Sequence, residues 1–202
     1  MATVTWDSLI PSLAPFLPNV PDVSMRGALR DSAASFLAQT YIWRAPFDPF
    51  ETEADVAQYG LYSDASIQAV LWVLVDGLEV AQTESQMVSK SRRDNTGKPK
   101  AFWVTRGSNI QFYPVPDKAY EVSGEVVLKP TRDARGVEGW VLDYWQDAII
   151  SGAIYRMAQI PGKDWTNAEL AQYHKRLHDR AIANARTWQL QNAGLRVQMR
   201  GA

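Results

Sequence analysis

The chain contains no cysteine among its 202 residues. This absence excludes disulfide bonds, thiolate metal sites and cysteine nucleophiles. Long apolar runs are also missing, since the longest, residues 69–75, is too short to cross a bilayer. The N-terminus has no basic stretch followed by an apolar one, so we expect no secretory signal and a protein that stays in the compartment where it is made.

A strong charge of either sign is absent as well. The formal net charge is −1 at pH 7, which argues against a protein that wraps nucleic acid by bulk electrostatics. Hydrophobic residues make up 46% of the chain and charged residues 21%. These values are typical of globular proteins, so the sequence predicts a folded core rather than disorder.

Proline recurs at intervals of three or four residues in the segment 1–21. That spacing forbids a continuous helix and predicts an extended arm with apolar anchors, which either the chain's own domain or a neighbouring subunit would cover. From Asp22 or Ser24 as the N-cap, a helix with one apolar face is predicted to run to about Trp43. Its predicted apolar positions are Met25, Leu29, Ala33, Phe36, Leu37, Thr40 and Trp43.

The periodicity then changes to that of strands. Asp76-Gly77 follows an apolar run and is a strong two-residue hairpin signal. A second hairpin is predicted from residues 101–105 and 110–113, and a last long strand over 121–128. Between the hairpins lies a basic loop, residues 89–100, that is a candidate contact for nucleic acid or a partner. Its cations are Lys90, Arg92, Arg93, Lys98 and Lys100.

Two amphipathic helices are predicted within residues 140–191, separated by Pro161-Gly162. Proline lacks an N–H group and glycine tolerates a left-handed exit, so this pair ends the first helix. Thr166, followed three residues later by Glu169, predicts a capping box at the start of the second.

Gly194 is expected to break the last helix, leaving residues 192–202 as a cationic extension. Beyond Gly194 apolar and polar side chains alternate, a pattern that suits strand addition or groove docking on a partner. A frayed terminus is the alternative interpretation. The candidate docking residues are Leu195, Arg196, Val197, Gln198, Met199 and Arg200.

Together these patterns predict an α+β fold. Residues 22–50 and 140–191 would form a helical-bundle core, and residues 51–139 an inserted antiparallel β-region. The segments 1–21 and 192–202 would be extended arms.

No pattern of catalytic or cofactor-binding residues is found. His174 and His178 have the spacing of a metal site but lack the glutamate of HExxH, and we expect them to be solvated on the surface. Gly162-Lys163 lacks the other residues of a phosphate-binding loop. The GxSxG motif that carries the nucleophile of serine hydrolases is absent from the sequence. The acidic residues of segment 51–55 are interpreted as a solvated loop. The sequence therefore predicts no cofactor, no metal and no enzymatic activity.

Three segments resemble the head-to-tail adaptor proteins of short-tailed bacteriophages, also described as portal adaptor or tail tubular protein A-like proteins. The first is residues 28–33 with the aromatic-basic turn 43–44. The second is the strand-to-linker signature at 127–133. The third and most specific is residues 160–167, leading into 173–174. The resemblance covers residues 22–186.

The resemblance implies a virion structural protein that forms a dodecameric ring beneath the portal, extends the DNA channel and presents a platform to the tail nozzle. Its partners would be further copies of itself, the portal protein and the nozzle protein, while genomic DNA passes through without sequence-specific binding. It would reside in the neck and tail of the virion, and in the host cytoplasm during assembly. By position, the resemblance assigns residues 194–202 to docking into the portal.

Two other functions are weighed against this one. A DNA-binding or packaging accessory protein would use the basic loop 89–100, although that loop has no aromatic residues for stacking on single strands. A wall-degrading hydrolase ranks low because no catalytic constellation is present.

Overall fold

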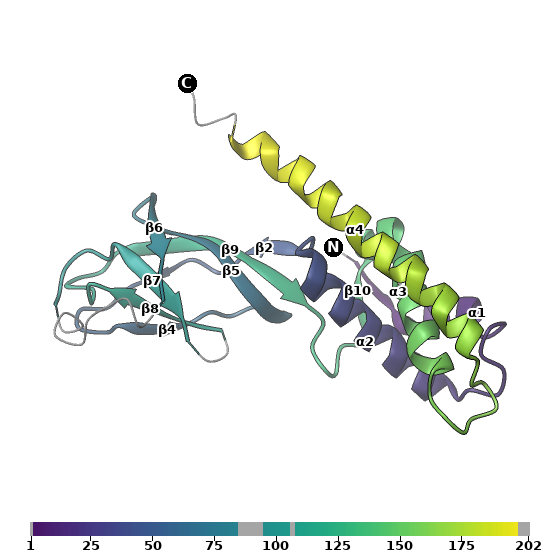
Figure 1. The fold of residues 1–202 in the computed structure, drawn as a ribbon. Coiled ribbons are helices and arrows are strands. Elements are labelled where there is room, and N and C mark those ends of the chain that lie inside the picture. Colours follow the sequence, from purple (N-terminus) through teal and green to yellow (C-terminus); the bar gives the residue numbers. More distant parts are fainter. Residues whose placement is uncertain (1, 85–94, 106–107, 198–202) are drawn as a thin grey trace. The chain divides into compact units, whose positions relative to one another are not determined.

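The computed structural model of the chain describes residues 2–84, 95–105 and 108–197, with side chains as far as residue 191 (Figure 1). The chain divides into two compact units. Unit 1 comprises Met1–Trp43 and Lys129–Ala202, and unit 2 comprises Arg44–Leu128. Unit 2 is therefore inserted between two parts of unit 1 in the sequence.

Unit 1 contains three long helices, α2 (Asp22–Thr40), α3 (Gly139–Ala158) and α4 (Ala168–Val197), each in contact with the other two. The predicted face of α2 is buried from Met25 to Thr40, so this part of the prediction is confirmed. Neither predicted N-cap is correct, because Pro21 occupies that position without a side-chain hydrogen bond. Tyr41, in the left-handed conformation at φ 58°, ends the helix, and its N–H donates to Leu37 O at 3.1 Å.

The predicted extended arm over residues 1–21 is wrong. This segment forms β1 (Thr3–Thr5), the 3₁₀ helix η1 (Trp6–Leu9) and the short helix α1 (Ile10–Leu13). Pro11 lies in the first turn of α1, where the missing N–H costs no hydrogen bond. Four of the apolar anchors are buried against unit 1 itself, whereas Phe16 is 44% exposed. The buried anchors are Trp6, Leu9, Leu13 and Leu17.

A small antiparallel sheet ties this N-terminal segment down. β1 pairs with β10 (Gly136–Glu138), with Val4 opposite Val137 and Thr5 opposite Gly136. A methyl group on Gly136 would lie 2.0 Å from Val4 O, so only glycine allows this close approach of the two strands. The Trp6 indole N–H also donates to Ala134 O at 2.8 Å.

Unit 2 is built on an eight-stranded sheet with the order β2-β9-β5-β6-β7-β8-β4, and β3 also pairs with β9. The strands are β2 (Arg44–Pro46), β3 (Phe50–Glu51), β4 (Gln58–Gly60), β5 (Ser66–Val75), β6 (Leu78–Gln82), β7 (Ala101–Val104), β8 (Asn109–Tyr113) and β9 (Glu121–Lys129). Both predicted hairpins are confirmed, because β5 pairs antiparallel with β6 and β7 with β8. The predicted long strand over 121–128 is β9.

The predicted fold class, a helical-bundle core with an inserted antiparallel β-region and extended arms, is wrong. In the described parts of the chain ten strands outnumber four α-helices, and eight of the strands form one sheet. The sheet is not purely antiparallel, since β6 and β7 run parallel, with Ala81 opposite Ala101. Strands of two or three residues, such as β1 and β3, are too short to show a periodic pattern in the sequence.

The start of α4 also differs from the prediction. Asn167, not Thr166, caps the helix, because its side-chain oxygen accepts the N–H of Leu170 at 3.0 Å. The Thr166 hydroxyl instead donates to Ile160 O and accepts from the N–H of Lys163, so it holds the turn that precedes the helix. The predicted break at Gly194 is absent, since α4 continues to Val197. None of the described helices is both long and apolar enough to cross a membrane.

Candidate partner-binding surfaces

The basic loop 89–100 is described only in part. Lys90, Arg92 and Arg93 lie outside the described residues. Lys98 donates to Asp76 Oδ2 at 2.9 Å and lies 5.6 Å from the centre of the Tyr120 ring, so its charge is used within unit 2. Lys100 is exposed, and its backbone N–H donates to Tyr113 O. The described part of the loop is thus attached to the sheet.

Tyr120 lies at the centre of this attachment. Lys118 also faces its ring, at 5.4 Å, and its hydroxyl donates to Asp117 Oδ1 at 2.6 Å. This hydrogen bond to a carboxylate, together with desolvation, raises the pKa of Tyr120 to about 12. The hydrogen bond from Lys98 lowers the pKa of Asp76. The Tyr120 hydroxyl therefore keeps its proton at neutral pH and donates it in the hydrogen bond to Asp117.

The candidate docking residues at the C-terminus fall largely outside what the structure describes. The backbone of Leu195, Arg196 and Val197 is helical as the end of α4, and their side chains are not described. Gln198, Met199 and Arg200 lie outside the described residues. Figure 1 shows the last turns of α4 running beyond the ends of α2 and α3.

The prediction of solvated histidines is wrong, because His174 and His178 are only 6% and 8% exposed. His178 Nδ1 donates to Ala148 O at 2.8 Å, and His174 Nδ1 lies 3.4 Å from the Ser151 hydroxyl. Desolvation lowers the pKa of both rings. Each ring therefore packs as a neutral group between α4 and α3. Among the described residues no group of three or more His, Cys, Asp or Glu side chains is placed to hold a metal ion.

The junction of α2, α3 and α4 is built around Gly152. The Ser32 hydroxyl of α2 donates to Ile149 O of α3 at 2.7 Å. His178 of α4 contacts the neighbouring residue of α3, Ala148. A methyl group on Gly152 would lie 2.2 Å from Ser32 Oγ and 2.7 Å from His178 Cε1. The Ser32 and His178 side chains therefore join α2 and α4 to the backbone of α3.

Gly162-Lys163 lies in the turn between α3 and α4, as expected from the sequence. Gly162 has φ 71°, a left-handed conformation that suits glycine. The Lys163 ammonium lies 5.8 Å from the centre of the Trp165 ring.

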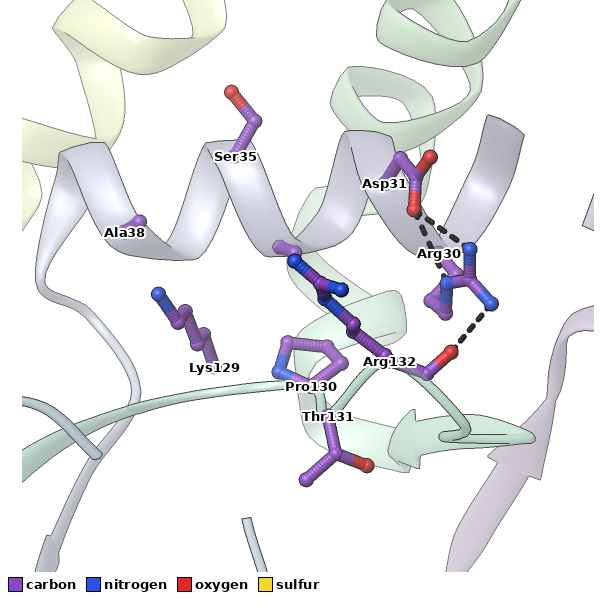
Figure 2. Close-up of a pocket in the computed structure, with 9 residues that line it drawn as sticks. Arg30, Asp31, Ser35, Ala38, Lys129, Pro130, Thr131 and Arg132 are labelled. Atoms are coloured by element: carbon purple, nitrogen blue, oxygen red, sulfur yellow. Dashed lines mark hydrogen bonds and ion pairs between the residues drawn. The ribbon is translucent and has the colours of Figure 1, made fainter. Parts of the chain in front are cut away.

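An open groove of about 320 Å³ lies along one side of α2 in unit 1 (Figure 2). The helix contributes Arg30, Asp31 and three small residues, and the segment 129–132 that follows the β9 strand forms the opposite side. The small residues are Ala34, Ser35 and Ala38.

Arg30 joins the two sides of this groove. Its guanidinium donates to Asp31 Oδ1 through Nε at 3.1 Å and Nη2 at 3.0 Å, and Nη1 donates to Arg132 O. Arg132 itself is exposed in a turn closed by the Ala134 N–H on Thr131 O. Figure 2 shows the side chains of Lys129 and Arg132 directed toward α2. Three basic side chains thus converge on one groove.

Sequence reasoning did not identify this groove as a site, although the segments 28–33 and 127–133 both carried the family resemblance. Arg30 and Arg132 are 102 residues apart, and only the fold brings them together. In the sequence, the two sides of this groove appear only as separate short segments with basic residues, 28–33 and 127–133.

Comparison of the sequence with curated proteins gives no match. Comparison with models of protein families gives a match to the SU10 adaptor protein family over residues 4–200, which includes both compact units. The match agrees with the resemblance to phage adaptor proteins, a class of virion structural proteins, and does not test the assignment to short-tailed phages. Because the match covers nearly the whole chain, the protein belongs to the SU10 adaptor protein family.

Proposed function

We propose that the protein is a head-to-tail adaptor that joins the portal to the tail nozzle of a short-tailed phage and acts by assembly rather than catalysis. The observation that carries this proposal is the family match over residues 4–200. We further propose that copies of the chain form a dodecameric ring that extends the DNA channel. The near-neutral net charge supports a channel wall past which DNA slides without sticking.

The ring is tested by measuring the mass of the purified protein alone and after mixing with the portal protein of its phage, followed by electron microscopy of the complex. We expect a ring coaxial with the portal. A protein that stays monomeric and fails to bind the portal at every concentration would contradict the proposal.

We propose that the end of α4 and the residues after it dock into the portal. The helical backbone through Val197 favours docking as a helix end over the strand addition expected from the sequence. Deleting residues 194–202 should abolish portal binding. A matched variant with Arg176→Ala, an exposed position earlier on α4, should bind normally. An unchanged affinity after the deletion would contradict this docking assignment alone.

The alternative function, a DNA-binding accessory protein that uses loop 89–100, stays a proposal. Lys98 is already paired with Asp76. Binding of DNA that weakens with salt and is lost in an Arg92→Ala/Arg93→Ala variant would favour this alternative.

A further inference from the structure

We propose that Asp76-Gly77 is a site of aspartate isomerisation, and that Lys98 keeps this modification slow by holding the Asp76 carboxylate. Asp-Gly occurs once in the chain, and Asn-Gly, which forms the same cyclic imide, does not occur. The proposed function assigns no modification to the chain and makes no use of this hairpin, so the inference goes beyond it. The proposal concerns how long the folded protein keeps its covalent structure.

The reaction requires only the two residues and water. The Gly77 backbone nitrogen attacks the carbon of the protonated Asp76 side-chain carboxyl, a C–N bond forms, and the hydroxyl leaves with the amide proton as water. Water then opens the cyclic imide at either carbonyl carbon. One opening restores aspartate, and the other gives isoaspartate, in which the backbone runs through the side-chain methylene group. Glycine favours the attack because it has no side chain to hinder it.

Both oxygens of the Asp76 carboxylate are bonded to groups outside the turn. Oδ2 accepts a hydrogen bond from Lys98 Nζ at 2.9 Å, and Oδ1 accepts one from the Glu121 N–H at 3.1 Å. The Asp76 N–H donates to Glu121 O at 2.9 Å. Cyclisation requires the carboxyl carbon to rotate onto the Gly77 nitrogen, and that rotation would break the bonds to Lys98 and Glu121. These contacts therefore oppose the first step of the reaction.

The backbone of the turn opposes the reaction as well. Asp76 and Gly77 have φ values of 49° and 74°, the left-handed pair of a two-residue hairpin, and Val75 pairs with Leu78 across it. The imide ring would contain the Asp76 Cα and the Gly77 nitrogen, so it closes only after the turn changes conformation. This rigidity would act without Lys98, and the experiment must separate the two contributions.

Lys98 also acts through its charge. Its hydrogen bond lowers the pKa of Asp76, and the positive charge of Lys118 acts in the same direction. Since the neutral carboxyl is the form that loses water, a lower pKa leaves less of the reactive form at neutral pH. Lys98 is itself positioned by Tyr120, whose ring centre lies 5.6 Å from the ammonium nitrogen.

The test measures isoaspartate at position 76 in full-length protein incubated for weeks at neutral pH. Enzymatic methylation of isoaspartate followed by peptide mass spectrometry gives its amount and its position. The wild type is compared with Lys98→Met, which removes the donor, and with Lys98→Arg, which keeps one. Lys100→Met is the charge-matched control, because Lys100 is an exposed lysine on the same segment. Val80→Ala weakens the packing of β6 and leaves both hydrogen bonds of the carboxylate in place.

We expect Asp76 to isomerise about two- to fivefold faster in Lys98→Met than in the wild type, which is the effect of losing one exposed ion pair. Lys98→Arg should largely restore the wild-type rate, and Lys100→Met should leave it unchanged. Val80→Ala should raise the rate less than Lys98→Met does. Wild-type protein kept unfolded in guanidinium gives the rate without any protection and should react fastest. Circular dichroism confirms that each variant is folded.

Three results would overturn the proposal. The first is isomerisation of the folded wild type as fast as that of the unfolded chain. The second is an equal rate in the wild type and in Lys98→Met. The third is a rate in Val80→Ala raised at least as much as in Lys98→Met, which would make the stability of the hairpin the source of protection. None of these measurements involves ring formation or the portal, so failure here is distinguishable from failure of the proposed function.

Discussion

The ring of His178 is tied to the backbone of Ala148, its Nδ1 donating to the carbonyl oxygen across 2.8 Å between α4 and α3. Desolvation lowers the pKa of His178 and His174 below the ordinary value of 6.5. The unfolded chain therefore takes up protons first as the pH falls. We expect the contribution of both rings to stability to be complete above the ordinary pKa and to be lost as the pH falls toward the lowered values.

This prediction is checked by urea unfolding at about pH 8 and about pH 5, in the wild type and in His174→Gln/His178→Gln. The free energy of unfolding of the wild type should fall more between the two conditions than that of the variant. An identical fall in both proteins would show that the histidines do not titrate differently on folding.

Gly152→Ala should destabilise unit 1 by about 1–3 kcal/mol, because the added methyl group overlaps Ser32 Oγ and the His178 ring. The matched control is Gly27→Ala in α2, where a methyl group would meet nothing within 4 Å. That control should stabilise the protein by about 0.5–1 kcal/mol through the higher helix propensity of alanine. Thermal and urea unfolding measure the change in stability that each substitution causes. Equal changes in Gly152→Ala and Gly27→Ala would contradict the close packing around Gly152.

Gly77→Ala should destabilise the β5–β6 hairpin by about 1 kcal/mol, since Gly77 has φ 74° and a Cβ is disfavoured there. Gly77→Asn is the control, because asparagine tolerates this conformation better and should cost less. Denaturant unfolding of both variants shows which of them has the lower free energy of unfolding. A variant with Ala as stable as the one with Asn would be inconsistent with a left-handed residue at this turn.

Asn167→Ala should cost about 1 kcal/mol, the usual effect of losing an N-cap side chain. Glu169→Ala should change the free energy of unfolding by less than about 0.5 kcal/mol, because Asn167 and not a Thr166–Glu169 box caps α4. Chemical denaturation measures the free energy of unfolding of both variants. A larger loss in Glu169→Ala than in Asn167→Ala would indicate that the Thr166–Glu169 capping box forms.

Local patterns predicted the elements that are long or have strong turn signals. The apolar face of α2 and the Asp76-Gly77 hairpin follow from spacing and turn chemistry alone. The parallel pairing of β6 with β7 could not be predicted, because strand order depends on contacts between segments distant in sequence. The burial of the N-terminal segment depends likewise on the surface that unit 1 offers to Trp6 and Leu13.

The histidines were misassigned although the sequence carried a signal for them. The buried positions of α4 recur every three or four residues, and both histidines fall within that series. Treating histidine as a polar surface residue hid this periodicity. The buried series is Ala171, His174, His178, Ile182 and Ala185.

The central claim, that this member of the SU10 adaptor protein family works by assembling on a portal, is tested most directly by one mass measurement. Native mass spectrometry of the purified protein mixed with its portal should give the mass of one portal bearing one ring of adaptor subunits. A mixture in which the two proteins keep their separate masses would contradict the account.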